Sequence, residues 1–226
     1  MVPRELIATA DVPGGDEPLR LIRRGDEFSI MLGSNELMNS RLSGSEEALA
    51  QLARDRLVNT ATPLVLIGGL GMGFTLRAAL EAFGAQARIT VAELVPEIVA
   101  WARGPMAHIN ASSLEDLRVT VHIGDVGALI ADARNRYDAI LLDVDNGPDG
   151  LSRAGNDALY DAAGLAAAHR ALVPGGVLAV WSSAPDARFT ARLRKAGFNG
   201  EETTVRARSN GRGARHTIWL AVRPFA

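Results

Sequence analysis

The sequence predicts an α/β fold with a doubly wound, mostly parallel sheet of seven strands, and three observations predict it. Short apolar runs separated by helix-like stretches, as in parallel strands joined by crossover helices, recur at residues 64–67, 88–92, 118–123, 137–142 and 177–181. Alternating glycines occupy residues 69–73, directly after the first run. Two last strand-like runs, 201–207 and 216–222, flank a polar loop, so we expect the sheet to end in an antiparallel hairpin.

A chain of 226 residues, 47% of them apolar, is long enough for one such domain with an N-terminal extension of about fifty residues. Residues 1–18 are rich in Pro and Gly and predict a loosely held segment, whereas 19–23 and 27–32 predict a β-hairpin. Residues 35–44 are polar and predict irregular structure. We therefore divide the chain into an extension at 1–60, a β-hairpin and a helix, and a main domain at 61–226.

The helix of this extension is predicted to start at Ser45 as its capping residue and to end near Asn59. Glu46 and Glu47 fall in its first turn, where acidic side chains interact favourably with the helix dipole. A substrate-binding role for Glu47 is the alternative that this position leaves open.

Gly69, Gly71 and Gly73 predict a loop that leads from the first parallel strand into a helix at about 74–83. Residues without a Cβ let a ligand approach the backbone, and the following helix directs free N–H groups toward it. A purely structural glycine turn is the other reading.

Glu93 ends the second parallel strand and is followed by Leu94. An acidic side chain at this place can hold both hydroxyls of a ribose through charge-assisted hydrogen bonds. The pattern predicts a nucleoside-containing cofactor. A dinucleotide is disfavoured, because its fingerprint requires a third glycine where Phe74 stands.

Gly124, Asp125 and Val126 follow the third strand, where a carboxylate can accept from an exocyclic amine while neighbouring backbone contacts the ring edge. The alternative is that Asp125 caps the next helix. Asp143 and Asp145 follow the fourth strand, at the edge where open α/β sheets bind ligands. This segment is the best catalytic candidate, the alternative being a structural loop with Asx-turns.

Beyond it, Asn156 is predicted to cap a helix to about Leu172, with a turn at 173–176 before the fifth strand and another helix at 184–196. A net charge of −2 argues against a general nucleic-acid binder, and the Arg-rich loop near 206–215 lacks aromatic residues for stacking on bases. The four histidines have no metal-ligand spacing, and no apolar run approaches the length of a membrane span. The absence of cysteine is consistent with a cytoplasmic enzyme.

These features resemble the class I S-adenosylmethionine-dependent methyltransferase fold, which is Rossmann-like, and more narrowly the spermidine synthase family. Residues 73–77, GFTLR, are similar to the end of that family's glycine loop, and residues 137–143, YDAILLD, to its Tyr-Asp-x-Ile-x-x-Asp. Family members also carry N-terminal β-structure and a following helix. The resemblance makes 61–226 a domain that binds S-adenosylmethionine or its decarboxylated form.

The resemblance also implies roles for single residues. Glu93 becomes the ribose ligand beside the glycine loop, Asp125 faces the adenine amine, and Asp143 deprotonates the attacking amine of a small-molecule substrate. Tyr160 and Asp145 are the residues expected near that substrate. Homodimerisation is common in the family and is expected here.

Two departures from the family pattern affect the expected reaction. Met72 stands where the family has an aspartate that holds the ammonium of the decarboxylated donor, and the loop after Asp143 is shortened. We therefore expect methyl transfer from intact S-adenosylmethionine to an amine, with Asp143 as general base. The alternatives are aminopropyl transfer from the decarboxylated donor to a diamine, and a non-catalytic nucleoside-binding or dimerisation module.

Overall fold

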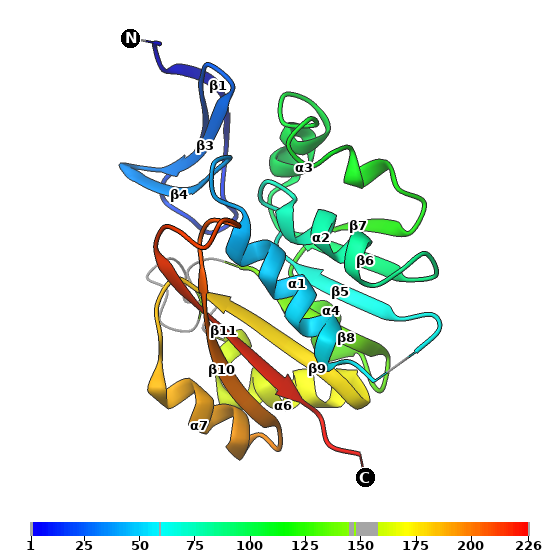
Figure 1. Ribbon diagram of the computed structural model, residues 1–226. Coiled ribbons are helices and arrows are strands. Elements are labelled where there is room, and N and C mark those ends of the chain that lie inside the picture. Colours follow the sequence, from blue (N-terminus) through cyan, green and yellow to red (C-terminus); the bar gives the residue numbers. More distant parts are fainter. Residues whose placement is uncertain (1, 59, 145–146, 148–157, 226) are drawn as a thin grey trace.

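The computed structural model describes residues 2–58, 60–144, 147 and 158–225, and it confirms the predicted α/β fold (Figure 1). Its main sheet has the strand order β10-β11-β9-β8-β5-β6-β7. The strands are β5 (Leu64–Gly68), β6 (Arg88–Glu93), β7 (Val119–Ile123), β8 (Tyr137–Leu142), β9 (Leu172–Ser182), β10 (Asn199–Arg206) and β11 (Arg215–Val222). β5 to β9 are parallel to one another, and the hairpin of β10 and β11 adds to β9 in the antiparallel sense, as expected.

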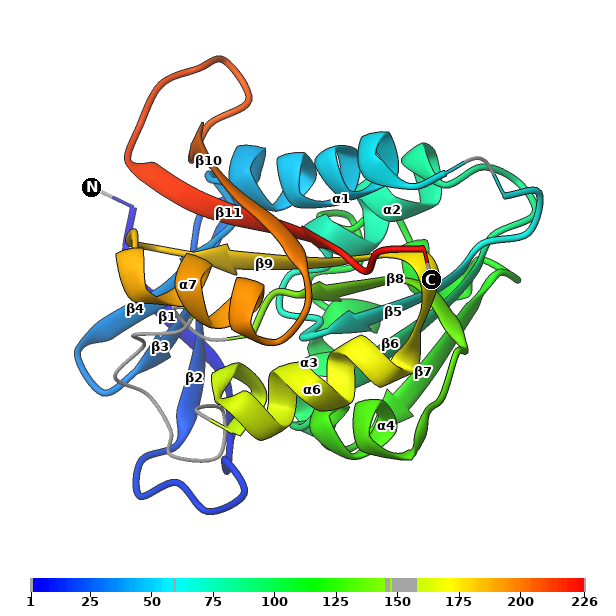
Figure 2. The same cartoon turned by 90° about the horizontal axis from the view of Figure 1, so that it is seen from below.

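Helices cover both faces of this sheet. The buried apolar side chains of α1 (Gly44–Arg56), α2 (Phe74–Ala82) and α3 (Pro96–Arg103) belong to one core cluster. Those of α4 (Val126–Asp132), α6 (Ala162–Ala171) and α7 (Ala187–Lys195) belong to a second cluster. A 3₁₀ turn, η1 (Ser113–Glu115), precedes β7. Figure 2 shows α1 and α2 on one side of the sheet and α4, α6 and α7 on the other.

The central strands are apolar throughout because both of their faces are buried. Val65 and Ile67 of β5 point into the first cluster, and Leu66 points into the second. Successive side chains of a strand alternate between its faces, so a strand with helices on both sides requires an unbroken apolar run. This is the pattern from which the strands were predicted.

The N-terminal extension holds an antiparallel sheet in the order β1-β2-β3-β4. Its strands are β1 (Glu5–Ala10), β2 (Leu19–Arg24), β3 (Glu27–Leu32) and β4 (Asn35–Asn39). The predicted hairpin is β2–β3, but the predictions of loose structure before it and irregular structure after it are wrong over β1 and β4. Half of the β1 residues and three of the five β4 residues are exposed at the edges of the sheet, so these strands lack the apolar alternation that identifies a half-buried strand.

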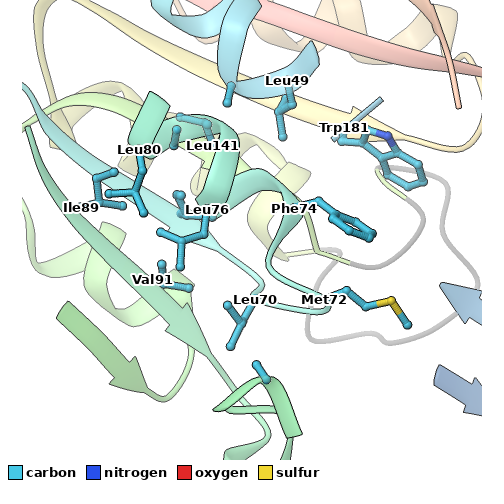
Figure 3. Packing of buried hydrophobic residues seen from close by; sticks show 14 of the residues in the cluster. Leu49, Leu70, Met72, Phe74, Leu76, Leu80, Ile89, Val91, Leu141 and Trp181 are labelled. Atoms are coloured by element: carbon cyan, nitrogen blue, oxygen red, sulfur yellow. The ribbon is translucent and has the colours of Figure 1, made fainter. Parts of the chain in front are cut away.

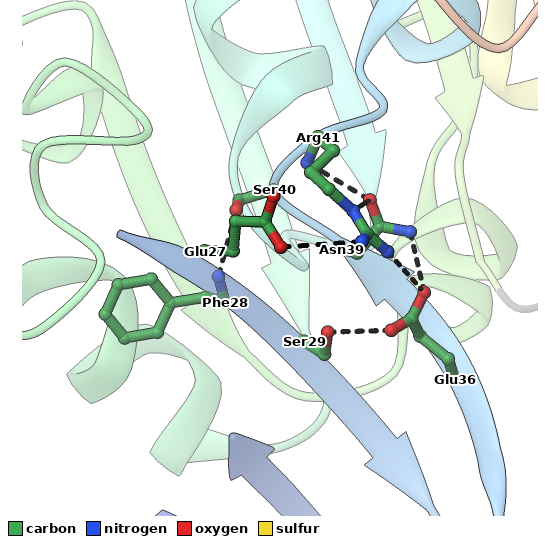
Figure 4. Close-up of polar contacts among 7 residues, drawn as sticks. All are labelled: Glu27, Phe28, Ser29, Glu36, Asn39, Ser40 and Arg41. Atoms are coloured by element: carbon green, nitrogen blue, oxygen red, sulfur yellow. Dashed lines mark hydrogen bonds and ion pairs between the residues drawn. The ribbon is translucent and has the colours of Figure 1, made fainter. Parts of the chain in front are cut away.

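Polar contacts link β3 to β4 and the residues after it (Figure 4). Ser29 Oγ donates to Glu36 Oε2 at 2.7 Å, and Asn39 Nδ2 donates to Glu36 Oε1 at 2.8 Å. The backbone N–H of Phe28 donates to Ser40 Oγ at 2.9 Å. A hollow of about 300 Å³ on this sheet is lined by Arg4, Leu6, Arg20, Ile22, Arg24, Glu27, Ser29, Met31, Glu36 and Arg41.

Two predicted element boundaries differ in the structure. α1 begins at Gly44, with Ser43 at its N-cap, so Ser45 lies inside the helix and is not its cap. β9 begins at Leu172 and includes the predicted turn, because Leu172 pairs with Tyr137 of β8. The predicted cap Asn156 lies outside the described residues. None of the described helices is long and apolar enough to cross a membrane.

Candidate active site at the carboxyl ends of the parallel strands

The glycine loop between β5 and α2 depends on glycine for its conformation. Gly69, Gly71 and Gly73 have φ values of +87°, +51° and +81°, in the left-handed region that other residues rarely adopt. A Cβ on Gly69 would clash with the carbonyl oxygen of Asp143, and one on Gly73 would lie 2.7 Å from Asn110 Cβ. The loop is therefore fixed by its contacts, and it brings the ends of β5 and β8 together.

Glu93 joins the end of β6 to this loop. Its carboxylate accepts from the backbone N–H of Leu70 and from that of Val95, both at 2.9 Å. Burial raises the pKa of Glu93, and these N–H donors oppose that effect. The N–H groups of Gly71 and Leu94 also act on this buried carboxylate, so Glu93 ties the glycine loop to the end of β6, and its role as ribose ligand stays a prediction. Leu94 beside it is half-buried.

The segment after β7 approaches the same edge of the sheet. The N–H of Gly124 donates to the carbonyl of Glu93 at 2.9 Å. Asp125 is the N-cap of α4, where its Oδ1 accepts from the N–H of Gly127 at 2.8 Å. Val126 is buried and packs against Gly68 at the end of β5. The capping role is present in the structure, and the adenine-binding role of Asp125 stays a prediction.

Asp143 follows β8 and is half-buried. Thr75 Oγ1, in the first turn of α2, donates to Asp143 Oδ2 at 2.5 Å. Burial raises the pKa of Asp143 to about 6, and the Thr75 hydrogen bond only partly opposes that shift. The result is a carboxyl group that is more basic than an ordinary aspartate, next to the glycine loop.

Glu46 is a second carboxyl group at this place, and sequence reasoning missed it. It is buried in the first turn of α1, and Ser45 Oγ donates to its Oε2 at 2.6 Å. Burial first, and then the charge of Asp143, raise the pKa of Glu46 to about 7. The signal was in the helix period, because Glu46 lies three and four residues before Leu49 and Ala50 and so shares their buried face.

Glu47, which the sequence offered as a substrate-binding candidate, forms an ion pair with Arg77. Its Oε1 lies 2.7 Å from Nη2 of Arg77 on α2, and both side chains are partly exposed. Arg77 also donates from Nη1 to the carbonyl of Ile109 at 2.7 Å. This ion pair ties α1 to α2, and a substrate role for Glu47 stays a prediction.

The remaining candidates are a loop residue and two core residues. Asp145 lies outside the described residues. Tyr160 is buried in the second core cluster and packs edge-to-face on Phe189, with ring centroids 5.8 Å apart. Met72 is 1% exposed and belongs to the first cluster, as do Phe74 and Trp181, which Figure 3 draws with it. Among the described residues, no group of three or more His, Asp or Glu side chains forms a metal site.

Comparisons with known proteins agree with this arrangement. Polyamine aminopropyltransferase 1 of Streptomyces coelicolor is 35% identical over 123 residues, which are 54% of this chain and 22% of that protein. The polyamine aminopropyltransferase of Mycobacterium tuberculosis is 31% identical over 190 residues, which are 78% of this chain and 34% of that protein. The chain thus spans about a third or less of the length of these two curated relatives.

Solved structures show the likeness of fold. Spermidine synthase from Thermotoga maritima superposes with a TM-score of 0.77 at 18% identity, over 98% of this chain and 74% of that chain. A probable spermidine synthase from Corynebacterium glutamicum superposes with a TM-score of 0.66 at 17% identity, over 97% of this chain and 80% of that chain. A family model, the spermine/spermidine synthase domain, matches residues 44–188, which include the glycine loop, Glu93 and Asp143. The chain therefore belongs to the spermine/spermidine synthase domain family.

Proposed function

We propose that this chain catalyses aminopropyl transfer from decarboxylated S-adenosylmethionine to a diamine. The observation that carries the proposal is the position of Asp143, a carboxyl group of raised pKa beside a glycine loop that is joined to Glu93. The relatives that this chain matches are named polyamine aminopropyltransferases. Their names support the choice of an aminopropyl donor and an amine acceptor.

The expectation of methyl transfer from the intact donor is not supported, and aminopropyl transfer replaces it as the proposed reaction. It depended on a Met72 thioether facing the charged end of the donor. The Met72 side chain is instead 1% exposed and packs among apolar residues of the first cluster. A thioether in that position gives no preference between a carboxylate and an ammonium in the donor.

The residues at the sheet edge fit a nucleoside donor. The three glycines leave the loop backbone open to close approach, and Glu93, the expected ribose ligand, accepts from the N–H of Leu70 in that loop. The donor supplies a carbon attached to a positively charged sulfur, which leaves as a neutral thioether when a nitrogen attacks that carbon. The protein's task is to hold the donor and to bring an unprotonated amine in line with this carbon.

Asp143 supplies the proton acceptor for that amine. Since Thr75 occupies Oδ2, Oδ1 is the oxygen that we assign to the ammonium proton. A pKa of about 6 leaves the group ionised near neutral pH and more basic than an ordinary aspartate, which suits a general base. The negative charges of Asp143 and Glu46, which act on each other, also favour a positively charged amine in the site.

Calorimetric titration of the purified chain with decarboxylated S-adenosylmethionine, the intact form and methylthioadenosine tests the choice of donor. We expect the decarboxylated donor to bind more tightly than the intact one and to be consumed when a diamine is added. Methyl transfer from the intact donor would contradict the proposal. Binding of none of the three would point to a non-catalytic module.

Met72→Asp is the companion variant. Because Met72 is buried in the core, we expect its replacement to lower the free energy of unfolding and to leave the ratio of the two donor affinities nearly unchanged. A large further shift of that ratio toward the decarboxylated donor would restore Met72 as a residue that selects the donor.

A further inference from the structure

The Ser45 hydroxyl lies between two titratable side chains from opposite ends of the chain. Its Oγ is 2.6 Å from Oε2 of Glu46 and 2.8 Å from Nδ1 of His216, which belongs to β11. Ser45 is fully buried, Glu46 is buried and His216 is half-buried. The Ser45 hydroxyl therefore joins Glu46, on which the charge of Asp143 acts, to the half-buried His216 near the start of β11.

A hydroxyl has one proton to donate, so Ser45 can donate to only one neighbour at a time. With Glu46 ionised, the Ser45 hydroxyl donates a hydrogen bond to Glu46 and accepts one from His216 Nδ1–H. With Glu46 protonated, its O–H donates to Ser45, and Ser45 donates to an unprotonated Nδ1. The ionisation of Glu46 and the tautomer of a neutral His216 are thus linked through one hydroxyl.

The electrostatic surroundings favour these states. Asp143 and Glu47 act on Glu46 as like charges, but Glu47 is paired with Arg77, so Asp143 is the main charged neighbour. Burial lowers the pKa of His216, which keeps the ring neutral. Its ring packs edge-to-face on Trp181 of β9, with centroids 4.8 Å apart, and its cross-strand partner on β10 is Val205.

We propose that Glu46, Ser45 and His216 form a proton path that carries the proton away from the Asp143 carboxyl group after each turnover. Glu46 is the second proton acceptor on this path. This inference rests on the proposed function. In the transfer, the amine nitrogen bonds to the donor carbon, the carbon–sulfur bond breaks, and the ammonium proton moves to Asp143. From Asp143 it passes to Glu46, a proton moves from Glu46 to Ser45 and from Ser45 to Nδ1, and Nε2–H releases a proton to water.

The first test measures kcat and KM for Ser45→Ala and His216→Ala, with Ser43→Ala as the matched control. Ser43 precedes α1, and its side chain makes no capping bond to the described residues. We expect kcat of both path variants to fall roughly tenfold or more with KM within about twofold, while the control stays at the wild-type rate. Added imidazole should restore His216→Ala but leave Ser45→Ala slow. Unchanged kcat in both variants would overturn the path.

The second test needs no substrate. It therefore tests the hydrogen-bonded link between Glu46, Ser45 and His216 even if the chain has no transferase activity. The ¹⁵N chemical shifts of His216 report which ring nitrogen carries the proton. We expect the Nε2–H tautomer below the titration of Glu46 and the Nδ1–H tautomer above it, with no such switch in Ser45→Ala or Glu46→Gln. One tautomer throughout pH 5–8 in the folded wild type would refute the link. A tautomer switch without any transfer would refute only the function.

Discussion

Asp143 combines a position at the end of a central strand with a proton affinity that burial has raised. Replacing it by asparagine keeps the shape and an acceptor for Thr75 but removes the ability to take a proton. For Asp143→Asn we expect kcat for the diamine to fall by about 10²–10⁴-fold, with donor affinity within a few-fold.

Steady-state rates and donor titration check this prediction, with Asp132→Asn on the exposed face of α4 as the control. A variant with wild-type kcat would remove Asp143 from the mechanism.

Glu46 makes the stability of the fold depend on pH in a direction opposite to that of a salt-bridged carboxylate. Its pKa rises from an ordinary 4.5 in the unfolded chain to about 7 in the folded one. Between these values the folded state binds more protons than the unfolded state, so the free energy of unfolding falls as pH rises through this window. The shift corresponds to a loss of up to about 3 kcal/mol.

Glu46→Gln removes this dependence. Urea denaturation at pH 5 and at pH 8 should show a smaller loss of stability for the variant than for the wild type. Glu81→Gln, at an exposed position on α2, should behave like the wild type. Equal losses in all three proteins would show that Glu46 ionises normally in the folded state.

At the scale of elements, the turn from β5 into α2 is restrained at Gly69, both by the backbone angle φ and by the nearby backbone of Asp143. Gly69 has φ +87° and lies against the Asp143 carbonyl. Gly84, after α2, has nearly the same angle, φ +83°, but no described atom lies within 4 Å of where its Cβ would stand. Gly84→Ala should cost about 1–2 kcal/mol from the left-handed conformation alone, and Gly69→Ala clearly more.

Denaturation midpoints of the two alanine variants separate these effects. The difference between them measures the contact between the glycine loop and the end of β8. Equal losses of stability would mean that the Asp143 backbone moves away without penalty.

At the scale of the whole molecule, the start of α1 is docked against the connection between β10 and β11. The N–H of Gly44 donates to the carbonyl of Ala207 at 2.9 Å, and a Cβ on Gly44 would meet the backbone of Arg208 and Ser209. Figure 1 shows this connection beside the start of α1. The site thus depends on a contact between the N-terminal part and the C-terminal hairpin.

Gly44→Ala should therefore force these segments apart, with a loss of about 1–3 kcal/mol and faster trypsin cleavage after Arg208 and Arg212. Calorimetry and timed proteolysis measure the two effects. Gly211→Ala, with φ +76° and open space around it, should cost about 1–2 kcal/mol without speeding cleavage elsewhere in the chain. Unaltered cleavage in Gly44→Ala would show that the contact does not hold the loop.

Homodimerisation and the division of the chain at residue 60 stay predictions. α1 falls on the N-terminal side of that division, yet it packs against α2 and β9 of the main domain. Sedimentation of the purified chain measures its oligomeric state. Sedimentation of a chain that begins at Gly44 tests whether the part from α1 onward stays folded without the N-terminal sheet.

The sequence by itself determined the main sheet, because strands buried on both faces need continuous apolar runs and their connections need helix-forming stretches. It also placed Gly69, Glu93 and Asp143 together, since the carboxyl ends of parallel strands meet at one edge. The edge strands β1 and β4 were not predicted because half or more of their residues are exposed, which leaves a weak apolar pattern.

The helix period can place Glu46 on the buried face of α1, but the tertiary structure decided how far each charged or polar group loses contact with water. Glu46 and Glu47 are adjacent and chemically alike, but packing of α1 on the sheet buries the first and leaves the second to pair with Arg77. The approach of His216 to Ser45 joins residues 171 positions apart, and the burial of Met72 depends on its neighbours in the core. The raised pKa of Glu46 follows from its burial, because desolvation acts on a side chain through everything packed around it.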